Sequence, residues 1–362
     1  MADLGILADD LTGTLDAAAP FASERAPVIA ALSEADLGAR FAICTCTRDE
    51  PPERAASAVA RKLPLLAGAR IAFKKIDSLL RGNTAIELAA CARSGVFRKV
   101  IISPAFPVQG RTMRHGRLLV NGRPEPDCGT LADKLASGMV NACSVTPADP
   151  WPDSDVLLCD ANSDHDLRRI VARGRALAGP VLWCGSAGLA RALAMRAGQV
   201  ERKRIPGLVV IGSIHAVSAG QSARLARAPG TDILEIRNPA DPVDGELSSR
   251  FAAKRLGLVE FHLPELPSEK ARCVYRAVFE KLAARIAAPR CMLIVGGDTA
   301  ALLMEVLKAR ALSVVGSWAD GIPLSRIKGG KWDRALVYTK SGAFQGCGLF
   351  ERILAECSRN DK

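Results

Sequence analysis

Short apolar runs alternate with segments of helical periodicity along almost the whole chain of 362 residues. Residues 4–8, 99–105 and 155–161 are examples of such runs, and most are followed by a helical pattern. This β-α-β alternation predicts a doubly wound α/β fold, in which helices cover buried parallel strands. Val, Ile, Leu and Ala supply the packing, because aromatic residues make up only 4% of the chain.

A polar and charged segment at 198–207 interrupts the alternation and ends on Pro-Gly. After it the pattern restarts with apolar runs at 208–213 and 291–295. The chain is also longer than one hydrophobic core usually supports. We therefore predict two α/β domains, at 1–200 and 206–362, each a mostly parallel sheet flanked by helices and joined by a linker.

Charge and cysteine content narrow the classes of partner. The net charge of +11 suits anionic ligands, but the basic residues are scattered and few aromatics are available to stack on bases. The 11 cysteines lie mostly in apolar segments, as in reduced cytoplasmic proteins, and the close pair Cys44 and Cys46 lacks zinc spacing. Neither a signal peptide nor a membrane-spanning run is recognised. We expect a cytoplasmic protein that binds neither nucleic acid nor membrane, and composition leaves the ligands of any metal open.

Three turns in the second domain follow apolar strands and contain Gly with Ser or Thr. They are "VIGSIHAVSAGQ" (210–221), "LIVGGDTAALL" (293–303) and "YTKSGAFQG" (338–346). Glycine lets backbone N–H groups approach a ligand, and a helix N-terminus favours phosphate. The set predicts a nucleotide or polyphosphate pocket, although three ordinary strand exits are the alternative. Neither a Walker A motif nor G-x-G-x-x-G occurs.

In the first domain, "FKKIDSLLRGN" (73–83) places charged side chains at a strand end. Strand alternation puts Lys75 and Asp77 on one face and Lys74 on the other. Lys75 and Arg81 are suited to bind a carboxylate, and Asp77 to accept a proton from a hydroxyl group. A structural network of ion pairs is the alternative explanation.

The segment "GILADDLTGTLDAA" (5–18) ends its apolar strand on Asp9 and Asp10. Adjacent strand residues point to opposite faces, so we expect one aspartate to face a ligand and the other to cap the next helix or hold the turn. Two carboxylates at a strand end also suit Mg²⁺-phosphate chemistry.

A Pro- and Gly-rich loop follows the strand at 99–105. Such a loop is expected to cap a site, with Arg111 and Thr112 as candidate ligand contacts. His115 is a weaker candidate, because a lone loop histidine is usually solvated.

Seven motifs of this chain resemble, in the same order, those of the four-carbon acid sugar kinase family. They are "ADDLTG" (8–13), "KKIDSLLRGN" (74–83), "SPAFPVQGRT" (103–112), "CGSAGLA" (184–190), "IGSIHAVSAGQ" (211–221), "VGGDTA" (295–300) and "TKSGAFQG" (339–346). Each motif is weak alone, but the ordered set spans nearly the whole chain and is specific.

The resemblance implies ATP-dependent phosphorylation of the terminal hydroxyl of a small sugar acid such as erythronate, threonate or 3-oxo-tetronate. The N-terminal domain would bind the acid and the C-terminal domain ATP, with Mg²⁺ as cofactor; a homodimer is left open. The implied acid contacts are Asp9, Asp10, Lys75, Asp77, Arg81, Gly110 and Arg111. The implied ATP contacts are Ser213, Gly296, Gly297, Asp298, Thr299 and Gly342.

Within that scheme we expect Asp10 or Asp77 to accept the hydroxyl proton and Asp298 to orient Mg²⁺. Two positions depart from the family pattern: Leu79 stands where the family has Thr, and Gln345 where it has Gly. A turn with positive φ would tolerate Gln345 poorly. Two other functions remain open, a non-catalytic sensor of nucleotide or sugar acid and a sugar-acid dehydrogenase, which the missing dinucleotide fingerprint disfavours.

Overall fold

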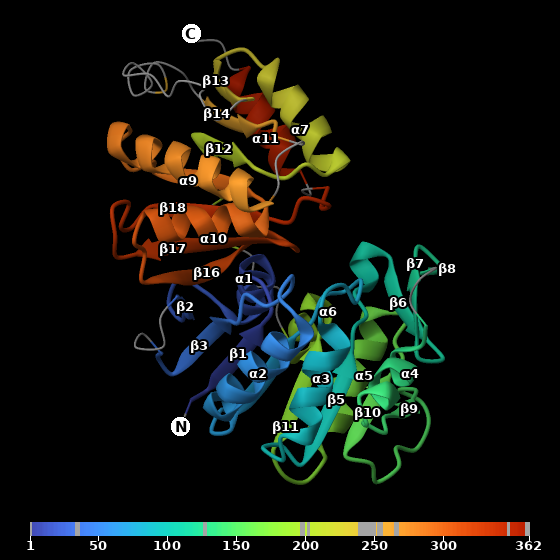
Figure 1. Ribbon diagram of the computed structural model, residues 1–362. Helices are drawn as coiled ribbons and strands as arrows, with labels where there is room; N and C mark the ends of the chain where they lie inside the picture. Colours follow the sequence, from blue (N-terminus) through green and yellow to red (C-terminus); the bar gives the residue numbers. More distant parts are fainter. Residues whose placement is uncertain are drawn as a thin grey trace. The chain divides into compact units, whose positions relative to one another are not determined.

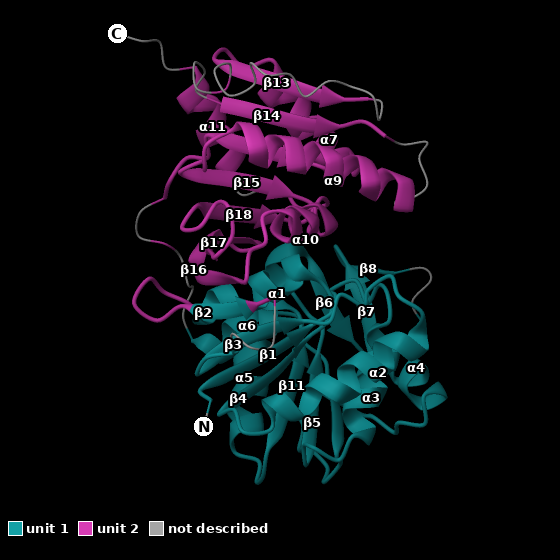
Figure 2. Cartoon of the chain, turned by 60° about the vertical axis from the view of Figure 1, so that its left-hand side comes forward, with its two compact units in different colours: residues 1–21, 28–30, 37–197 teal, residues 22–27, 31–36, 198–362 magenta. Residues whose placement is uncertain are grey.

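The computed structural model describes most of the chain. The described residues are 2–32, 37–125, 129–195, 200, 203–237, 251, 256–263, 268–345 and 348–358. They divide into two compact units, shown in different colours in Figure 2. The first unit contains residues 1–21, 28–30 and 37–197, and the second contains residues 22–27, 31–36 and 198–362. The predicted linker at 198–207 lies partly outside the described residues.

The first unit is built on a sheet whose strands run parallel from β3 through β9 (Figure 1). Its spatial order is β2 (Val28–Ala31), β3 (Arg40–Cys44), β1 (Leu4–Ala8), β4 (Ile71–Lys75), β11 (Val181–Gly185), β5 (Lys99–Ser103), β10 (Val156–Cys159) and β9 (Cys143–Val145). All five residues of both β1 and β5 are buried, as the continuous apolar runs require of strands covered on both faces.

Two layers of helices pack on this sheet. In one layer α2 (Pro52–Lys62) contacts α3 (Thr84–Arg93), which contacts α4 (Leu131–Ser137). In the other, α1 (Leu11–Ala18) contacts α6 (Ala187–Ala194), which contacts α5 (Asp164–Arg175). Ser163 caps α5 by accepting a hydrogen bond from the backbone N–H of Asp166.

A three-stranded antiparallel sheet follows β5, where the sequence predicts only an irregular loop. Its strands are β6 (Arg111–Arg114), β7 (Arg117–Val120) and β8 (Arg123–Pro124). His115 and Gly116, both with positive φ, form the two-residue turn between β6 and β7. Such a turn is typical of a tight β-hairpin, so the loop has more regular structure than predicted.

The sheet of the second unit is parallel from β13 to β18 and antiparallel beyond. Its spatial order is β13 (Thr231–Ile236), β14 (Leu256–Phe261), β12 (Leu208–Ile211), β15 (Cys291–Val295), β18 (Leu336–Lys340), β17 (Ile322–Lys328) and β16 (Ala311–Ala319). The sheet is accompanied by α7 (Ala216–Ala226), α9 (Ser268–Arg285), α10 (Gly297–Val306) and α11 (Leu349–Cys357). The prediction of an α/β fold with mostly parallel sheets is confirmed.

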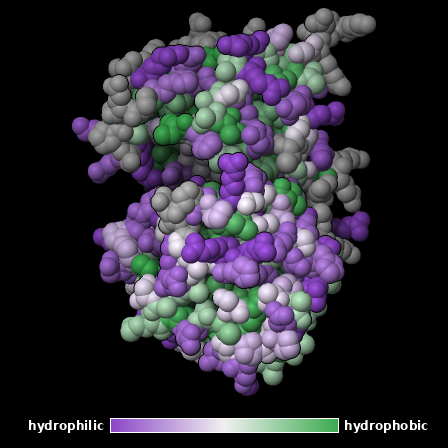
Figure 3. All heavy atoms as spheres, turned by 90° about the vertical axis from the view of Figure 1, so that its right-hand side faces the viewer, coloured by the Kyte–Doolittle hydropathy of each residue, from purple (hydrophilic) through white to green (hydrophobic). Residues whose placement is uncertain are grey.

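Polar side chains cover much of the surface seen in Figure 3, with smaller hydrophobic patches between them. Among the described helices, none combines the length and the apolar character that crossing a bilayer requires.

Candidate functional site

Asp9 and Asp10 follow β1 directly and are held by one guanidinium group, that of Arg48. Arg48 Nε and Nη2 donate to the two carboxylate oxygens of Asp9 at 2.8 and 3.0 Å. Its Nη1 and Nη2 also donate to the oxygens of Asp10 at 2.8 and 2.9 Å. Both aspartates lie beyond the last residue of β1, so strand alternation does not send their carboxylates to opposite faces.

Asp10 is also the N-cap of α1, one of the two roles expected for this pair of aspartates. Its Oδ1 accepts from the backbone N–H of Gly13 at 2.9 Å, and its Oδ2 accepts from the Thr12 hydroxyl at 2.6 Å. A Cβ at position 13 would lie 2.3 Å from Asp10 Oδ1, which explains why glycine ends this motif.

Arg48 is a residue that sequence reasoning missed. It lies four residues after β3, the strand adjacent to β1, and the backbone N–H of Thr47 donates to the carbonyl of Asp9 at 2.9 Å. Asn83 fixes this loop by donating from Nδ2 to the carbonyls of Thr47 and Glu50 at 2.9 and 2.7 Å. The rule that ligands meet the carboxyl ends of strands, applied to residues 40–44, would have found it.

Gly82 explains another part of the "KKIDSLLRGN" motif. Its φ is +64°, and a Cβ there would lie 2.7 Å from the carbonyl oxygen of Arg48. The "RGN" part of the motif therefore supports the Arg48 loop through Gly82 and Asn83.

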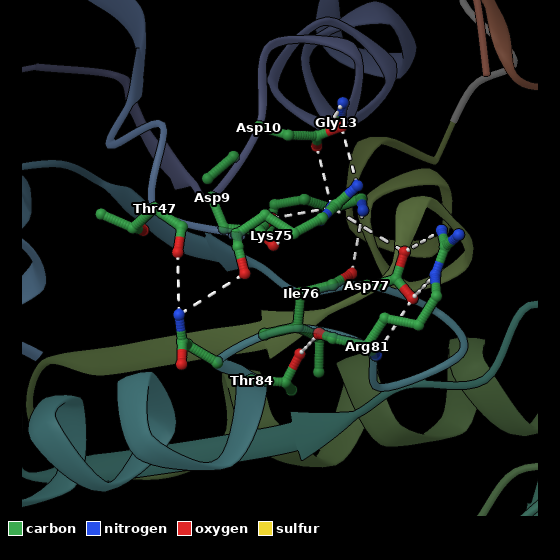
Figure 4. A network of polar contacts seen from close by, with 12 residues as sticks. Asp9, Asp10, Gly13, Thr47, Lys75, Ile76, Asp77, Arg81 and Thr84 are labelled. Carbon is green, nitrogen blue, oxygen red and sulfur yellow. Dashed lines mark hydrogen bonds and ion pairs between the residues drawn. The ribbon is translucent and has the colours of Figure 1, made fainter. Parts of the chain in front are cut away.

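Asp77 and Arg81 form a bidentate pair just beyond β4 (Figure 4). Arg81 Nε and Nη2 donate to Asp77 at 2.9 and 2.7 Å, and the backbone N–H of Leu79 donates to Asp77 Oδ2 at 3.0 Å. Arg48 Nη2 lies 3.8 Å from Asp77 Oδ1, which joins this pair to the two aspartates after β1. Asp77 therefore stabilises the turn after β4 through the backbone N–H of Leu79 and also forms an ion pair with Arg81.

Lys74 and Lys75 leave β4 on opposite faces, as predicted. Lys75 Nζ donates to the carbonyl of Ile76 at 2.8 Å and lies 3.3 Å from where a Gly13 Cβ would be, beside α1. Lys74 Nζ donates to Glu87 of α3 at 2.6 Å, and both side chains are buried. Lys74 therefore belongs to an internal ion pair, whereas Lys75 faces the aspartates.

Burial and neighbouring cations set the protonation of these carboxylates. Burial alone would raise the pKa of Asp9, but Arg48, Lys74 and Lys75 together hold it below its usual value. Burial also works to raise the pKa of Asp77, yet Arg81, Arg48 and Lys75 hold it far below the usual range. Both groups are carboxylates at neutral pH.

Gly110 and Arg111 reach the same region from the start of β6. Gly110 has φ +68°, and a Cβ there would lie 2.2 Å from the side-chain oxygen of Asn121. Arg111 Nη1 donates to the Ser78 hydroxyl at 2.6 Å, and burial lowers the pKa of Arg111 while Asp77 raises it. The structure therefore brings all seven predicted acid contacts to the ends of β1, β4 and β5.

Thr112 and His115, the two other candidate ligand contacts, lie at different places on the β6–β7 hairpin. Thr112 is half-buried on β6, whereas the His115 side chain is exposed at the tip of the hairpin. The backbone N–H of His115 donates to Asp160, which also accepts from Gly116 at 3.0 Å. The His115 position serves the turn rather than the charged cluster.

The three glycine turns of the second unit meet at the ends of adjacent strands, because β15 lies between β12 and β18. A Cβ at Gly342 would lie 1.9 Å from Ser213 Oγ, and one at Gly296 would lie 2.8 Å from Thr299 Oγ1. Gly296 has φ +118° and precedes α10 without a side-chain cap. Five of the six predicted ATP contacts thus surround the start of α10, and Gly342 approaches it through Ser213.

Asp298 lies in the first turn of α10 and is exposed. Within the part of the chain that the structure describes, His, Cys, Asp and Glu side chains form no group of three or more suited to a metal ion. Mg²⁺ bound with a nucleotide takes most ligands from phosphate and water and needs only one or two carboxylates.

Gln345 does not strain the third turn. Its φ lies outside the left-handed region, since it is not among the residues with positive φ. Its carbonyl oxygen accepts a hydrogen bond from Gln221 of α7. The condition under which glutamine would be poorly tolerated, a positive φ, is therefore not met at this position.

Comparison with known proteins shows that the chain is similar to a family of sugar-binding domains and to sugar-acid kinases. Residues 4–143 match a family model described as the sugar-binding N-terminal domain. A D-threonate kinase of Cupriavidus necator is 29% identical, and the alignment covers 94% of this chain and 94% of that protein. A 3-oxo-tetronate kinase of Pseudomonas fluorescens is 24% identical over 98% of this chain and 96% of its own length. The predicted resemblance to the four-carbon acid sugar kinases is confirmed.

Solved structures show the same fold. A Salmonella typhimurium protein described as a putative tRNA synthase superposes with a TM-score of 0.74 at 20% identity, over 97% of this chain and 98% of that one. A Haemophilus influenzae protein from a family of unknown function gives 0.69 at 17% identity, over 97% and 99%. At these identities the likeness concerns the fold alone.

Proposed function

We propose that this protein is an ATP-dependent kinase that phosphorylates the terminal hydroxyl of a small sugar acid of the threonate, erythronate or 3-oxo-tetronate type. The curated relatives, which align over almost the full length of the chain, are sugar-acid kinases by name. ATP is the proposed phosphoryl donor for that reason. The cytoplasmic location and a homodimer stay predictions.

The observation that carries the proposal is a cluster of cations and carboxylates at the strand ends of the first unit. Lys74 and Glu87 neutralise each other and are set aside. Four cations, Arg48, Lys75, Arg81 and Arg111, remain beside Asp9, Asp10 and Asp77, and Asp16 also acts on Arg111. Such cations would bind the carboxylate of a sugar acid, and the carboxylates would accept hydrogen bonds from its hydroxyls.

In the proposed reaction the acid's terminal hydroxyl oxygen forms a bond to the γ-phosphorus of ATP, the bond from that phosphorus to the β,γ-bridging oxygen breaks, and ADP leaves. Asp10 is the proposed acceptor of the hydroxyl proton. Asp77 suits this role less, because its pKa is held far below the usual range. Lys75, Arg81 and Arg111 would hold the acid's carboxylate.

For the nucleotide, we propose contacts from Ser213, Gly296, Gly297, Thr299 and Gly342. Mg²⁺ would neutralise phosphate charge, with Asp298 as its protein ligand. The N-terminus of α10, whose first N–H groups have no side-chain cap, adds a favourable field for phosphate.

A screen of ATP consumption tests the proposal. Purified protein is incubated with MgATP and the stereoisomers of threonate, erythronate and 3-oxo-tetronate, and products are identified by ³¹P NMR. We expect one or more acids to yield a phosphate monoester at the terminal carbon. If no acid in the panel stimulates ADP formation, the proposed function is wrong.

A further inference from the structure

Lys340, the last residue of β18, is a fully buried lysine to which neither the sequence motifs nor the proposed reaction assigns a role. Its Nζ donates to the carbonyls of Ser341, Gly342 and Phe344 at 2.8, 3.4 and 2.7 Å. Three acceptors match the three N–H bonds of a protonated ammonium group, whereas a neutral amine has only two. The side chain therefore curls back under the turn that follows its own strand.

The charge of Lys340 is not balanced by a carboxylate in the way that the charge of Lys74 is. Lys74, equally buried, has the carboxylate of Glu87 at 2.6 Å. Among the described residues, no carboxylate lies within ion-pairing distance of Lys340 Nζ, and its other close contact is the ring of Phe350, 5.8 Å from the ammonium. Burial lowers the pKa of Lys340 to about 7, so the protonated form is only partly populated at neutral pH without a counter-ion. Keeping a lysine inside a protein without a counter-ion is costly, which points to a role beyond packing.

Side chains of α7 hold the same turn from its carbonyl side. The Ser218 hydroxyl donates to the carbonyl of Gly342 at 2.7 Å, and Gln221 Nε2 donates to the carbonyl of Gln345 at 2.5 Å. Together with Lys340, these donors occupy the carbonyl oxygens of residues 341, 342, 344 and 345.

This arrangement fixes where the N–H groups of the turn point. In a trans peptide the C=O and N–H bonds point in opposite directions. Carbonyls 341, 342 and 344 face Lys340, so the N–H groups of Gly342, Ala343 and Gln345 face away from it. Within the described part of the chain, these three N–H groups make no hydrogen bond. Successive unpaired amides of this kind form an anion-binding concavity.

We propose that Lys340 is a positioning residue that shapes residues 341–345 into a binding site for the phosphate groups of the nucleotide. The inference rests on the proposed function, since it assumes a phosphorylated ligand in the second unit. Lys340 acts through the turn: it withdraws the carbonyls, whose partial negative charge would repel phosphate, and leaves the amides for the ligand. Phosphate bound there would also supply the counter-charge that the buried ammonium lacks.

The test compares the full-length protein with Lys340→Met and with Lys328→Met as the matched control. Lys328 is an exposed lysine at the end of β17, the strand that pairs with β18. We titrate each protein with a fluorescent ADP analogue in Mg²⁺, then displace the analogue with inorganic tripolyphosphate, and measure KM for ATP and for the acid separately.

We expect Lys340→Met to raise the Kd of the ADP analogue and the KM for ATP by about tenfold or more, the value of one charge-assisted hydrogen bond. The KM for the acid should stay within about twofold, and Lys328→Met should match wild type. A general loss of structure would change the KM for ATP and the KM for the acid alike. A rise in the KM for ATP alone therefore identifies a positioning role.

Other outcomes overturn the inference. A folded Lys340→Met protein with wild-type nucleotide affinity contradicts it, as does failure of tripolyphosphate to displace the analogue from wild type. If Lys340→Met does not fold, Ser218→Ala decides, because it removes one donor from the same turn; a several-fold weaker nucleotide affinity supports the inference and unchanged affinity refutes it. Wild-type protein that binds no nucleotide at all refutes the proposed function as well, which makes the two failures distinguishable.

Discussion

Replacing Arg48 by methionine removes a guanidinium group that contacts two adjacent carboxylates. Four hydrogen bonds of 2.8–3.0 Å join Arg48 to Asp9 and Asp10, and the exposed fraction of its side chain is only 20%. Removing one partner of a buried ion pair typically costs about 3–5 kcal/mol, because the other charge stays buried and unpaired. We expect a loss of that size in the free energy of unfolding of the first unit at pH 7.5.

The loss should depend on pH in a way that follows from Asp9. In wild type the pKa of Asp9 is held below its usual value, so the stability that Asp9 contributes is present above about pH 4 and is lost only as the pH falls further. Without Arg48, burial is the largest influence on the pKa of Asp9 and only Lys74 and Lys75 oppose it, so we expect that pKa to rise above its unfolded value. The variant then gains stability as the pH falls from 7.5 to 5, and the difference in the free energy of unfolding between variant and wild type becomes smaller.

Hydrogen exchange of peptides from β1 and β4, combined with urea unfolding at pH 7.5 and 5, measures these changes for the first unit. Arg54→Met is the matched control, since Arg54 pairs with Glu50 on the surface with 77% of its side chain exposed. Such a pair is worth at most about 1 kcal/mol. A destabilisation for Arg48→Met no larger than that of the control, or one that is equal at both pH values, would refute the reasoning.

Three further variants test other parts of the molecule. Glu87→Gln leaves the buried Lys74 without its carboxylate and should destabilise the protein by about 3–5 kcal/mol; a thermal midpoint unchanged from wild type would contradict this. Gly342→Ala places a Cβ 1.9 Å from Ser213 Oγ, so the KM for ATP should rise about tenfold or more with the KM for the acid unchanged; equal changes in both would count against it. Asp10→Asn should lower kcat by about 100-fold or more if Asp10 accepts the hydroxyl proton, and steady-state kinetics with an unchanged kcat would exclude that role.

Much of the fold follows from the sequence because its strands are apolar and its helices begin at recognisable caps. The strands at 4–8 and 291–295 and the helix after Ser163 are found where the patterns predict them. The first helix begins at Leu11, where the Asp10 side chain caps it.

The sequence patterns do not predict two antiparallel hairpins that the structure contains. β6 and β7 are joined by a turn at His115 and Gly116, and β16 and β17 by a turn that contains Gly321 at φ +77°. Asp-Gly at 320–321 is a typical hairpin turn sequence, but the alternation of apolar runs and helical patterns does not reveal it. The hairpins change the edges of the fold and leave the parallel centre as predicted.

The candidate site was predictable wherever a functional residue lies in the same short segment as a strand end. Lys75, Asp77 and Arg81 satisfy that condition. Arg48 also follows a strand end, but its contact with Asp9 and Asp10 depends on β3 lying beside β1, a pairing between strands that local patterns do not reveal. Sheet order, rather than motif content, is what brings the missing cation to the site.

Lys74 and Lys340 show that the sequence also does not predict which buried charges have a counter-ion. Both are lysines at the ends of central strands, and both are fully buried, so the sequence around them gives no reason to treat them differently. The carboxylate of Glu87 neutralises Lys74 inside the fold, and the pair is complete without a ligand. Among the described residues, Lys340 has only carbonyl dipoles of one turn and an aromatic ring around its charge. A buried charge with a counter-ion inside the fold contributes to stability. A buried charge without a counter-ion is expected where a ligand of opposite charge binds.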